Sequence, residues 1–321
     1  MRLLLISIVG LSACAPKPAA MLMPNTGDDG GLGAADAGTA DGGASCQPVC
    51  TAWTNPRALG DIVAPVVELS GLAASRTQPG VLYAHNDSGD SARFFALSAT
   101  NGSLLQEFSV QGATNRDWED MAVGPCATGW CLFIGDIGDN NRVRTDYALY
   151  VIPEPVVVNG GAEATVPAQR LPYQYPMGAR NNAEALVVDP RSGRPYVLTK
   201  APGAGQPSVV YRFPLPLTPG TQVTLEEVAT LPVPGPTDSQ LTGADLSPCG
   251  DALLLRMYNR LVLMSTDGGS LESVFTTTPI AVPAAQEGQG EAVAFAADGR
   301  SYFTASEAVL GAPPLFQSTC R

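Results

Sequence analysis

Residues 184–198 have the sequence EALVVDPRSGRPYVL, in which two short apolar runs flank a turn that contains Pro, Ser and Gly. Residues 290–303, GEAVAFAADGRSYF, repeat this order of apolar run, turn and apolar run. Short apolar runs bounded by turn residues are typical of antiparallel β-strands rather than of helices. The two segments therefore predict strand pairs and indicate an internal repeat.

The repeat occurs five times, with copies that begin at Ser70, Glu119, Glu184, Thr242 and Glu291, 49 to 65 residues apart. Further apolar runs, which we expect to form strands, lie at 81–84, 94–97, 132–134, 148–151, 196–198 and 209–211. A period of this length with four short strands per unit predicts a β-propeller. We therefore expect an all-β fold of five four-stranded blades, or six if the insert at 154–176 contains a degenerate blade. The alternative is a β-sandwich whose segments are similar by chance.

The last repeat is shorter than the others. After Glu307 only residues 315–317 could supply another strand, whereas residues 61–68, before the first repeat, have no partner of their own. We expect the segment 61–68 to complete the final blade, because a closed ring leaves no sheet edge open to aggregation.

The first 13 residues have the features of a secretory signal. Arg2 is followed by an apolar run at 3–11 that is too short to span a bilayer, and then by LSAC at 11–14. This ending resembles the bacterial lipobox, whose Cys is acylated and becomes the mature N-terminus. The resemblance implies a signal peptide at 1–13 and a membrane-anchored lipoprotein of the cell envelope, held by acyl chains on Cys14. Ala15, rather than Asp, favours the outer membrane, and the alternative is an ordinary signal peptide cut near Ala13 or Ala20.

Residues 14–45 are rich in Ala, Gly and Asp and contain almost no aromatic or β-branched residue. Such a segment cannot bury enough apolar surface to offset its conformational entropy. We expect a disordered tether at 14–45 and a propeller domain at 46–321.

The segments at 184–198 and 290–303 resemble repeats of NHL and gluconolactonase-like propellers, and of the propeller group named for the esterase-like activity of phytase. In gluconolactonase-like enzymes the Glu that opens such a repeat binds a divalent metal. Glu119, Glu184 and Glu291 occupy this position here. The resemblance implies a propeller fold and, as one of two functions, a metal-dependent hydrolase of the lactonase or phosphoesterase kind.

Six cysteines remain after Cys14, a number that suits disulfide bonds in an oxidising compartment. Their spacing suggests the pairs Cys46–Cys50 and Cys126–Cys131, which leaves Cys249 to pair with Cys320. A single histidine and the lack of paired Cys-x-x-Cys motifs argue against a zinc site.

Acidic residues offer the clearest chemistry. HNDSGD at 85–90 and GDIGDN at 135–140 share Asp-x-Gly-Asp, and Asp87 and Asp136 each lie 17 residues after the start of their repeat. At the corresponding position, the end of the second strand, the third blade has Lys200, the fifth has Glu307 and the fourth has, approximately, Arg256. We expect these side chains to face a central funnel together with Glu119, Glu184 and Glu291. Converging carboxylates suit Ca²⁺, and they would repel one another without a cation or protons.

The same motifs have a structural alternative, because Asp-x-Gly-Asp-Asn is also a good turn sequence and because propellers use buried acids to bind neighbouring blades through backbone N–H groups. His85, the only histidine, is expected to be a hydrogen-bonded structural residue. Gly-x-Ser-x-Gly, a phosphate loop and a dinucleotide fingerprint are all absent from the sequence.

The formal net charge of −12 argues against nucleic acid and against direct adsorption to anionic lipid, so the lipid would be the sole membrane attachment. Two functions stay open for what we expect to be a monomer. The first is a binding or scaffold propeller that holds a protein, glycan or small molecule, and the second is the hydrolase implied by the resemblance. We favour binding.

Overall fold

The computed structural model describes residues 49–321 apart from 202, 204–205, 233–239, 267–268 and 308–310. The predicted signal peptide, the tether, Cys14 and Cys46 lie outside these residues. Within the described part, no helix is both long enough and apolar enough to cross a bilayer.

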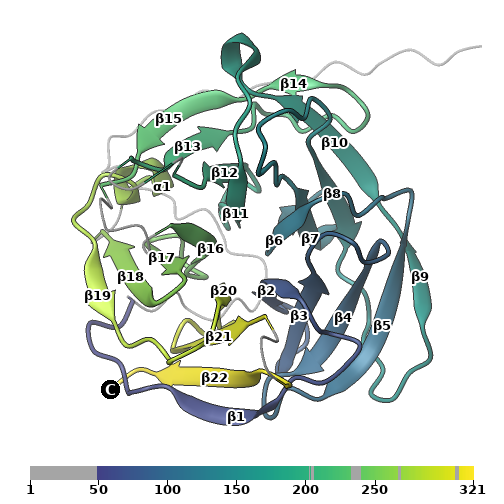
Figure 1. The fold of residues 1–321 in the computed structure, drawn as a ribbon, viewed down its shortest axis with the longest axis vertical. Helices are drawn as coiled ribbons and strands as arrows, with labels where there is room; N and C mark the ends of the chain where they lie inside the picture. The colour runs from purple at the N-terminus through teal and green to yellow at the C-terminus, as the bar shows by residue number, and fades with distance from the viewer. Residues whose placement is uncertain (1–48, 202, 204–205, 233–239, 267–268, 308–310) are drawn as a thin grey trace, which may run out of the picture. The chain divides into compact units, whose positions relative to one another are not determined.

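Five sheets surround a central axis, with β2, β6, β11, β16 and β20 innermost, and the four main strands of each sheet are antiparallel (Figure 1). The first blade contains β2 (Leu69–Ala74), β3 (Val81–Asn86), β4 (Arg93–Ser98) and β5 (Leu104–Gln111). The second contains β6 (Trp118–Cys126), β7 (Gly129–Asp136), β8 (Ala148–Pro153) and β10 (Gln169–Gln174). The third contains β11 (Ala183–Val188), β12 (Pro195–Thr199), β13 (Val209–Arg212) and β15 (Glu226–Thr230). The fourth contains β16 (Leu241–Leu246), β17 (Ala252–Met257), β18 (Arg260–Ser265) and β19 (Ile280–Val282), with the short helix α1 (Leu271–Val274) before β19. The fold is thus a five-bladed β-propeller, as the repeats predict.

The insert at 154–176 contains no sixth blade. Its first strand, β9 (Ala164–Pro167), pairs in parallel with β5 and widens the first blade to five strands. Its second strand is β10, the outer strand of the second blade, to which β14 (Val223–Thr224) adds in parallel. The insert is long because it first adds β9 to the first blade and only then supplies β10 to the second blade.

The fifth blade closes the ring with strands from both parts of the chain. It contains β20 (Gly290–Phe295), β21 (Ser301–Ser306), β22 (Pro314–Thr319) and, outermost, β1 (Arg57–Asp61). Closure by an N-terminal strand is confirmed, but the strand lies earlier than the predicted 61–68. That segment instead places Ile62 and Val66 in the core between the fifth and first blades.

Two of the three predicted disulfides are wrong. Cys126–Cys131 forms as predicted across the β6–β7 hairpin, whereas Cys50 bonds to Cys320 and not to Cys46. The chain before β1 runs along the closing blade, where Trp53 forms a β-bridge with Cys320, and this brings Cys50 within reach. Cys249, which was predicted to bond to Cys320, is itself disulfide-bonded.

The core consists of five apolar clusters, each between two neighbouring blades. Successive side chains of a strand point to opposite faces, so an inner strand supplies two clusters. Leu186 and Val188 of β11 pack against the second blade, whereas Ala185 and Val187 pack against the fourth. Burial on both faces explains why the inner strands are apolar without alternation.

Every innermost strand contains a β-bulge at the same place. The pairing register shifts at the residue that opens each repeat, namely Ser70, Glu119, Glu184, Thr242 and Glu291. A bulge inserts one unpaired residue and re-aims its side chain. The repeat therefore presents one side chain per blade at the same end of the central axis.

Candidate functional site

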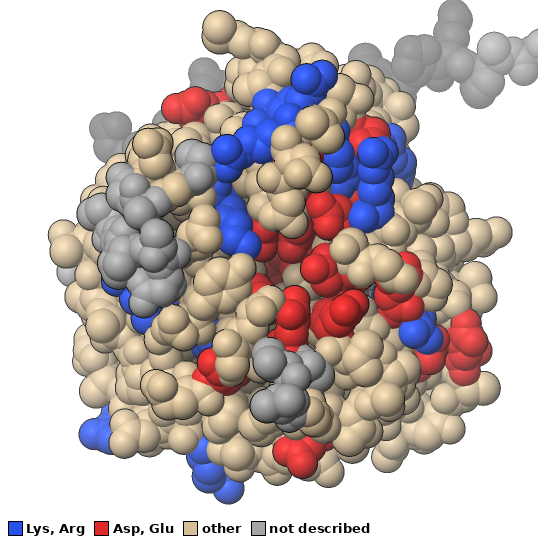
Figure 2. Space-filling model, in the orientation of Figure 1, with Lys and Arg blue, Asp and Glu red and all other residues tan. Residues whose placement is uncertain are grey.

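A cavity of about 140 Å³ lies where the bulged residues and the ends of the second strands meet. Its lining is polar throughout and consists of Ser70, Asp87, Glu119, Asn140, Glu184, Lys200, Tyr258, Gln289, Glu291 and Glu307. We call this cavity the funnel. Five of its side chains are carboxylic acids and one is an amine. Figure 2 shows the acidic side chains gathered at the centre of this face.

Three carboxyl groups form a tight cluster, and two of them, Asp87 and Glu119, line the funnel, whereas Asp117 lies next to them outside its lining. Oxygens of Asp87, Asp117 and Glu119 all lie within 4.8 Å of one another. Glu119 is only 5% exposed, and its carboxylate accepts no hydrogen bond from the residues that the structure describes. We call Asp87, Asp117 and Glu119 the acidic triad.

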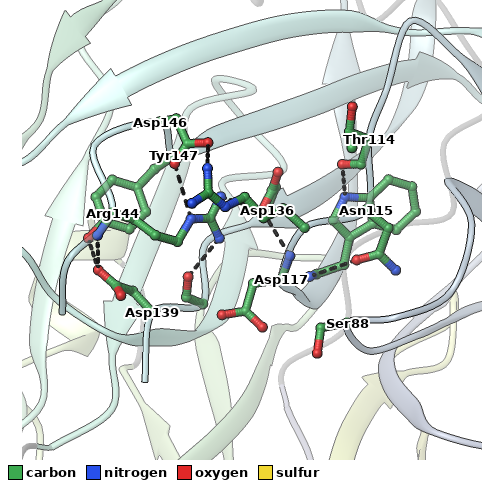
Figure 3. A network of polar contacts seen from close by, with 12 residues as sticks. Ser88, Thr114, Asn115, Asp117, Asp136, Asp139, Arg144, Asp146 and Tyr147 are labelled. Carbon is green, nitrogen blue, oxygen red and sulfur yellow. Dashed lines mark hydrogen bonds and ion pairs between the residues drawn. The ribbon is translucent and has the colours of Figure 1, made fainter. Parts of the chain in front are cut away.

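The second Asp-x-Gly-Asp motif positions the triad rather than extending it. The Asp136 carboxylate accepts a hydrogen bond from the backbone N–H of Asp117 at 3.2 Å, while the Asp117 carbonyl accepts bonds from Ile137 and Gly138. A Cβ atom at Gly138 would lie 2.2 Å from Glu119 Oε1, so a side chain here would displace the triad. The motif thus fixes the Asp117 main chain and leaves its carboxylate unbonded (Figure 3).

The first Asp-x-Gly-Asp motif is attached to the same loop. Asn115 Nδ2 donates to the carbonyl of Asp87 at 2.8 Å, and Asn115 Oδ1 accepts from the backbone of Trp118 at 3.3 Å. Ser70 Oγ donates to the Glu119 carbonyl at 2.6 Å. These contacts between the first and second blades bring Asp87 to the two acids of the second blade.

The third blade supplies the one cation among the residues that line the funnel. Lys200 Nζ lies 3.1 Å from Glu184 Oε1 and donates to the Tyr258 hydroxyl at 2.9 Å. Asn182 donates to the same Glu184 oxygen at 2.6 Å. Glu184 is therefore neutralised within the protein, unlike the acidic triad.

The fifth blade contributes two further acids. Gln289 Nε2 donates to Glu307 at 2.7 Å, and Glu291 lines the same cavity at 4% exposure. In the described part of the chain neither acid forms an ion pair.

Burial and mutual repulsion raise the pKa of most of these acids. Desolvation and the nearby charges of Glu184 and Asp87 hold the pKa of Glu119 well above its usual value. Desolvation and Asp87 raise the pKa of Asp117 to about 6. Desolvation raises the pKa of Glu291 to about 8. The protein alone therefore favours protonated acids here, and a bound cation would favour the ionised form.

The structure brings Glu119, Glu184, Glu291 and Asp87 together in the funnel, along with Lys200 and Glu307, and their roles as ligands stay a prediction. Asp136 does not line the cavity, because Arg144 forms a buried ion pair with it at 2.6 Å (Figure 3). Arg256 likewise lies outside the funnel, where its guanidinium pairs with Glu287 at 2.7 Å. Tyr258, two residues later, lines the cavity at the place expected for Arg256.

Sequence reasoning missed Asp117, which belongs to neither repeated position. The sequence feature that could have identified Asp117 is its alternation with Glu119 at the start of an inner strand. His85 is completely buried, contacts Asn86 through Nδ1 and Trp118 through its ring, and has a pKa lowered by desolvation to about 4.

No family model matches the sequence, and no curated protein matches it. The fold is similar to a periplasmic gluconolactonase of Pseudomonas aeruginosa, with 17% identity over 73% of this chain and 64% of that chain, and a TM-score of 0.38. It is also similar to a protein described as a 6-phosphogluconolactonase of Bacteroides uniformis, with 14% identity over 74% and 63% of the two chains, and a TM-score of 0.37. The chain spans slightly less than two thirds of these two proteins. A protein described as a glucose dehydrogenase of Thermus thermophilus gives 12% identity over 82% and 99%, and a TM-score of 0.43. At these identities the similarity concerns the propeller fold alone.

Proposed function

We propose that this chain is a lipid-anchored envelope protein whose propeller binds its ligand through a calcium ion in the funnel. The observation that carries the proposal is the acidic triad, whose carboxylates converge within 4.8 Å and form no ion pair with a basic side chain among the described residues. The ion would supply the positive charge that the triad lacks.

The donor set fits calcium. Ca²⁺ binds oxygen ligands at about 2.3–2.6 Å, so two oxygens on one ion lie no more than about 5 Å apart. Asp87, Asp117 and Glu119 meet this limit with carboxylates, the ligands that Ca²⁺ prefers. Three protein residues would leave coordination positions for water or a ligand, because Ca²⁺ takes six to eight oxygens.

Calcium binding by the purified full chain tests the proposal. We expect a bound ion by calorimetric titration, and we expect Glu119→Gln to weaken binding by at least about a hundredfold, since a charged ligand becomes neutral. Glu163→Gln, at an exposed position just before the outer strand β9 and outside the lining of the funnel, is the matched control and should bind as the unaltered chain does. If the unaltered chain does not bind calcium, or if Glu119→Gln binds it equally well, the proposal is wrong.

A metal-dependent hydrolase is the second candidate, and Glu291 is the observation that favours it. Its pKa of about 8 keeps the carboxyl partly protonated near neutral pH, as a general acid requires. Assays of the calcium-loaded chain on lactones and phosphoesters distinguish the two functions. Turnover that a chelator abolishes, and that Glu291→Gln lowers while calcium affinity is kept, would favour the hydrolase over binding.

The anchor is tested separately. We expect the cells to incorporate labelled palmitate into the unaltered protein, and we expect Cys14→Ser to lose the label and to leave the membrane fraction, because no other acylation site is predicted. Cys46→Ser should keep the label. A mature protein with an unmodified N-terminus near residue 14 or 21 would show that the ordinary signal peptide is the correct interpretation.

A further inference from the structure

We infer that the ligand of the funnel is an organic anion, whose carboxylate or phosphate group is bound by Arg142 and Lys200 beside the acidic triad. This inference rests on the proposed calcium site and names the chemical class of the ligand that the site takes.

A second pocket adjoins the funnel. It has a volume of about 230 Å³ and is lined by Arg142, Asn181, Thr199, Lys200, Gln206, Pro207 and Val209. Lys200 lines both cavities, so the two are neighbours. The pocket differs from the funnel in charge, because its lining contains two basic residues and no acid.

The two basic residues of this pocket differ in their pairing, because Lys200 is shared with Glu184 of the funnel whereas Arg142 has no acidic partner in the described part of the chain. Figure 2 shows basic side chains along one side of the acidic cluster. Neither Arg142 nor Arg180 forms an ion pair with a carboxylate in the part of the chain that the structure describes. The acidic triad likewise forms no ion pair, so this face has an unpaired arginine and unpaired carboxylates in addition to the Lys200–Glu184 pair. Separate charges of this kind are complementary to a ligand that bridges a cation and a basic pocket.

The loop that carries Arg142 is fixed by internal contacts. The Asp139 carboxylate accepts hydrogen bonds from the backbone of Val143 and Arg144 and from the Tyr147 hydroxyl, at 2.6–2.9 Å. Within this loop Arg142 has a φ of 53°, a left-handed conformation that non-glycine residues rarely adopt. Strained backbone that its surroundings hold in place is concentrated at ligand sites.

Neighbouring contacts fix the other wall of the pocket. Asn182 accepts a hydrogen bond from the backbone of Asp139 at 2.6 Å and donates to both Asn140 and Glu184. Arg180 Nε donates to the carbonyl of Arg144 at 3.2 Å. The loops from the second and third blades are thus joined, so the Arg142 guanidinium is presented on a rigid support. An arginine in such a place binds carboxylate or phosphate through paired N–H donors.

Three small probes with one carbon skeleton test the inference on the calcium-loaded full chain: glycerol, glycerate and glycerol 3-phosphate. By calorimetric titration we expect at least one of the two anions to bind, and glycerol not to bind. The anion that binds more tightly identifies the group that the pocket prefers. By reciprocity, that anion should raise the affinity for calcium by the factor by which calcium raises its own.

Arg142→Gln should weaken anion binding about tenfold or more without weakening calcium binding, because it removes a charged donor from the pocket alone. Arg57→Gln, on the outer strand β1, is the matched control and should change neither affinity. Anions that bind no better than glycerol, or that bind Arg142→Gln as well as the unaltered chain, would overturn the inference while the calcium site stands. A chain that binds no calcium would instead overturn the proposed function.

Discussion

The calcium-free protein should lose stability as the pH rises from about 6.5 to about 8.5, by roughly 2 kcal/mol in the free energy of unfolding from Glu291 alone. The cause is the raised pKa of the buried funnel acids, above all Glu119 and Glu291. Urea denaturation in the presence of a chelator, repeated across this range, measures the effect.

The sign follows from proton binding. In the unfolded chain a Glu has a pKa near 4.3, so it is fully ionised above about pH 6.5. In the folded protein Glu291, with a pKa of about 8, still holds its proton over much of this range, and the raised pKa of Glu119 acts in the same direction. Because the folded state binds more protons, each such proton lowers stability by about 1.4 kcal/mol per pH unit. His85 acts weakly in the opposite direction, because its folded pKa is lowered to about 4 and only the unfolded chain still binds a proton near pH 6.5. This raises stability by roughly 0.4 kcal/mol over the same range.

Two controls separate the funnel acids from other groups. Glu291→Gln should flatten the decline, because Gln cannot titrate. Saturating calcium should reverse it, because the ion binds the ionised carboxylates and binds more tightly as they lose protons. A decline of the same slope in Glu291→Gln would show that Glu291 is not its origin, and a chelator without effect on the profile would contradict the calcium site.

The blade repeat was predictable because each blade buries its inner strand on both faces. This requirement produces continuous apolar runs such as Leu186–Val188 followed by a turn, and the same physics acts at every repeat. The outer strands face fewer constraints. The ring closes with Arg57–Asp61, which is exposed or half-buried and has no apolar pattern, whereas the apolar segment after it fills the core. The apolar pattern therefore predicted the wrong segment, 61–68, as the closing strand.

The funnel was predictable to the extent that it follows the repeat. Glu119, Glu184 and Glu291 share one position, and the bulge at that position turns each of them inward. The positions of Asp117 and Asp136, by contrast, are set by contacts within a single loop and not by the repeat. Arg144, eight residues after Asp136, pairs with its carboxylate, which also accepts a hydrogen bond from the backbone of Asp117. The backbone N–H groups of Ile137 and Gly138 donate to the Asp117 carbonyl and complete the support of Asp117. Asp117 therefore joins the triad, whereas Asp136, the predicted ligand, supports it. This outcome depends on tertiary contacts that a single sequence does not reveal.

The largest single effect on folding is expected at Asp120, beside the triad on β6. Its carboxylate is completely buried and accepts three backbone hydrogen bonds, from Met121, Leu186 and Ala244 at 2.8, 2.9 and 3.2 Å. These donors belong to the second, third and fourth blades, so one side chain joins three inner strands. Buried acids that bind neighbouring blades were one expectation from the sequence, but they occur here and not in the Asp-x-Gly-Asp motifs. Asp245 plays the same part for the fourth and fifth blades, accepting from Leu246 and Phe295.

Asp120→Ala should lower the free energy of unfolding by roughly 3–6 kcal/mol, because each buried N–H that loses its acceptor costs about 1–3 kcal/mol. Asp120→Asn keeps one acceptor oxygen and should cost about half as much. Asp298→Ala, in an exposed turn, is the matched control and should change stability by less than about 0.5 kcal/mol. Urea denaturation of the three variants measures the order of their free energies of unfolding. Burial also raises the pKa of Asp120 well above its usual value, so the carboxylate has a desolvation cost of its own. If that cost outweighed the three hydrogen bonds, Asp120→Asn would be as stable as the unaltered protein, and the joining of blades through this residue would be disproved.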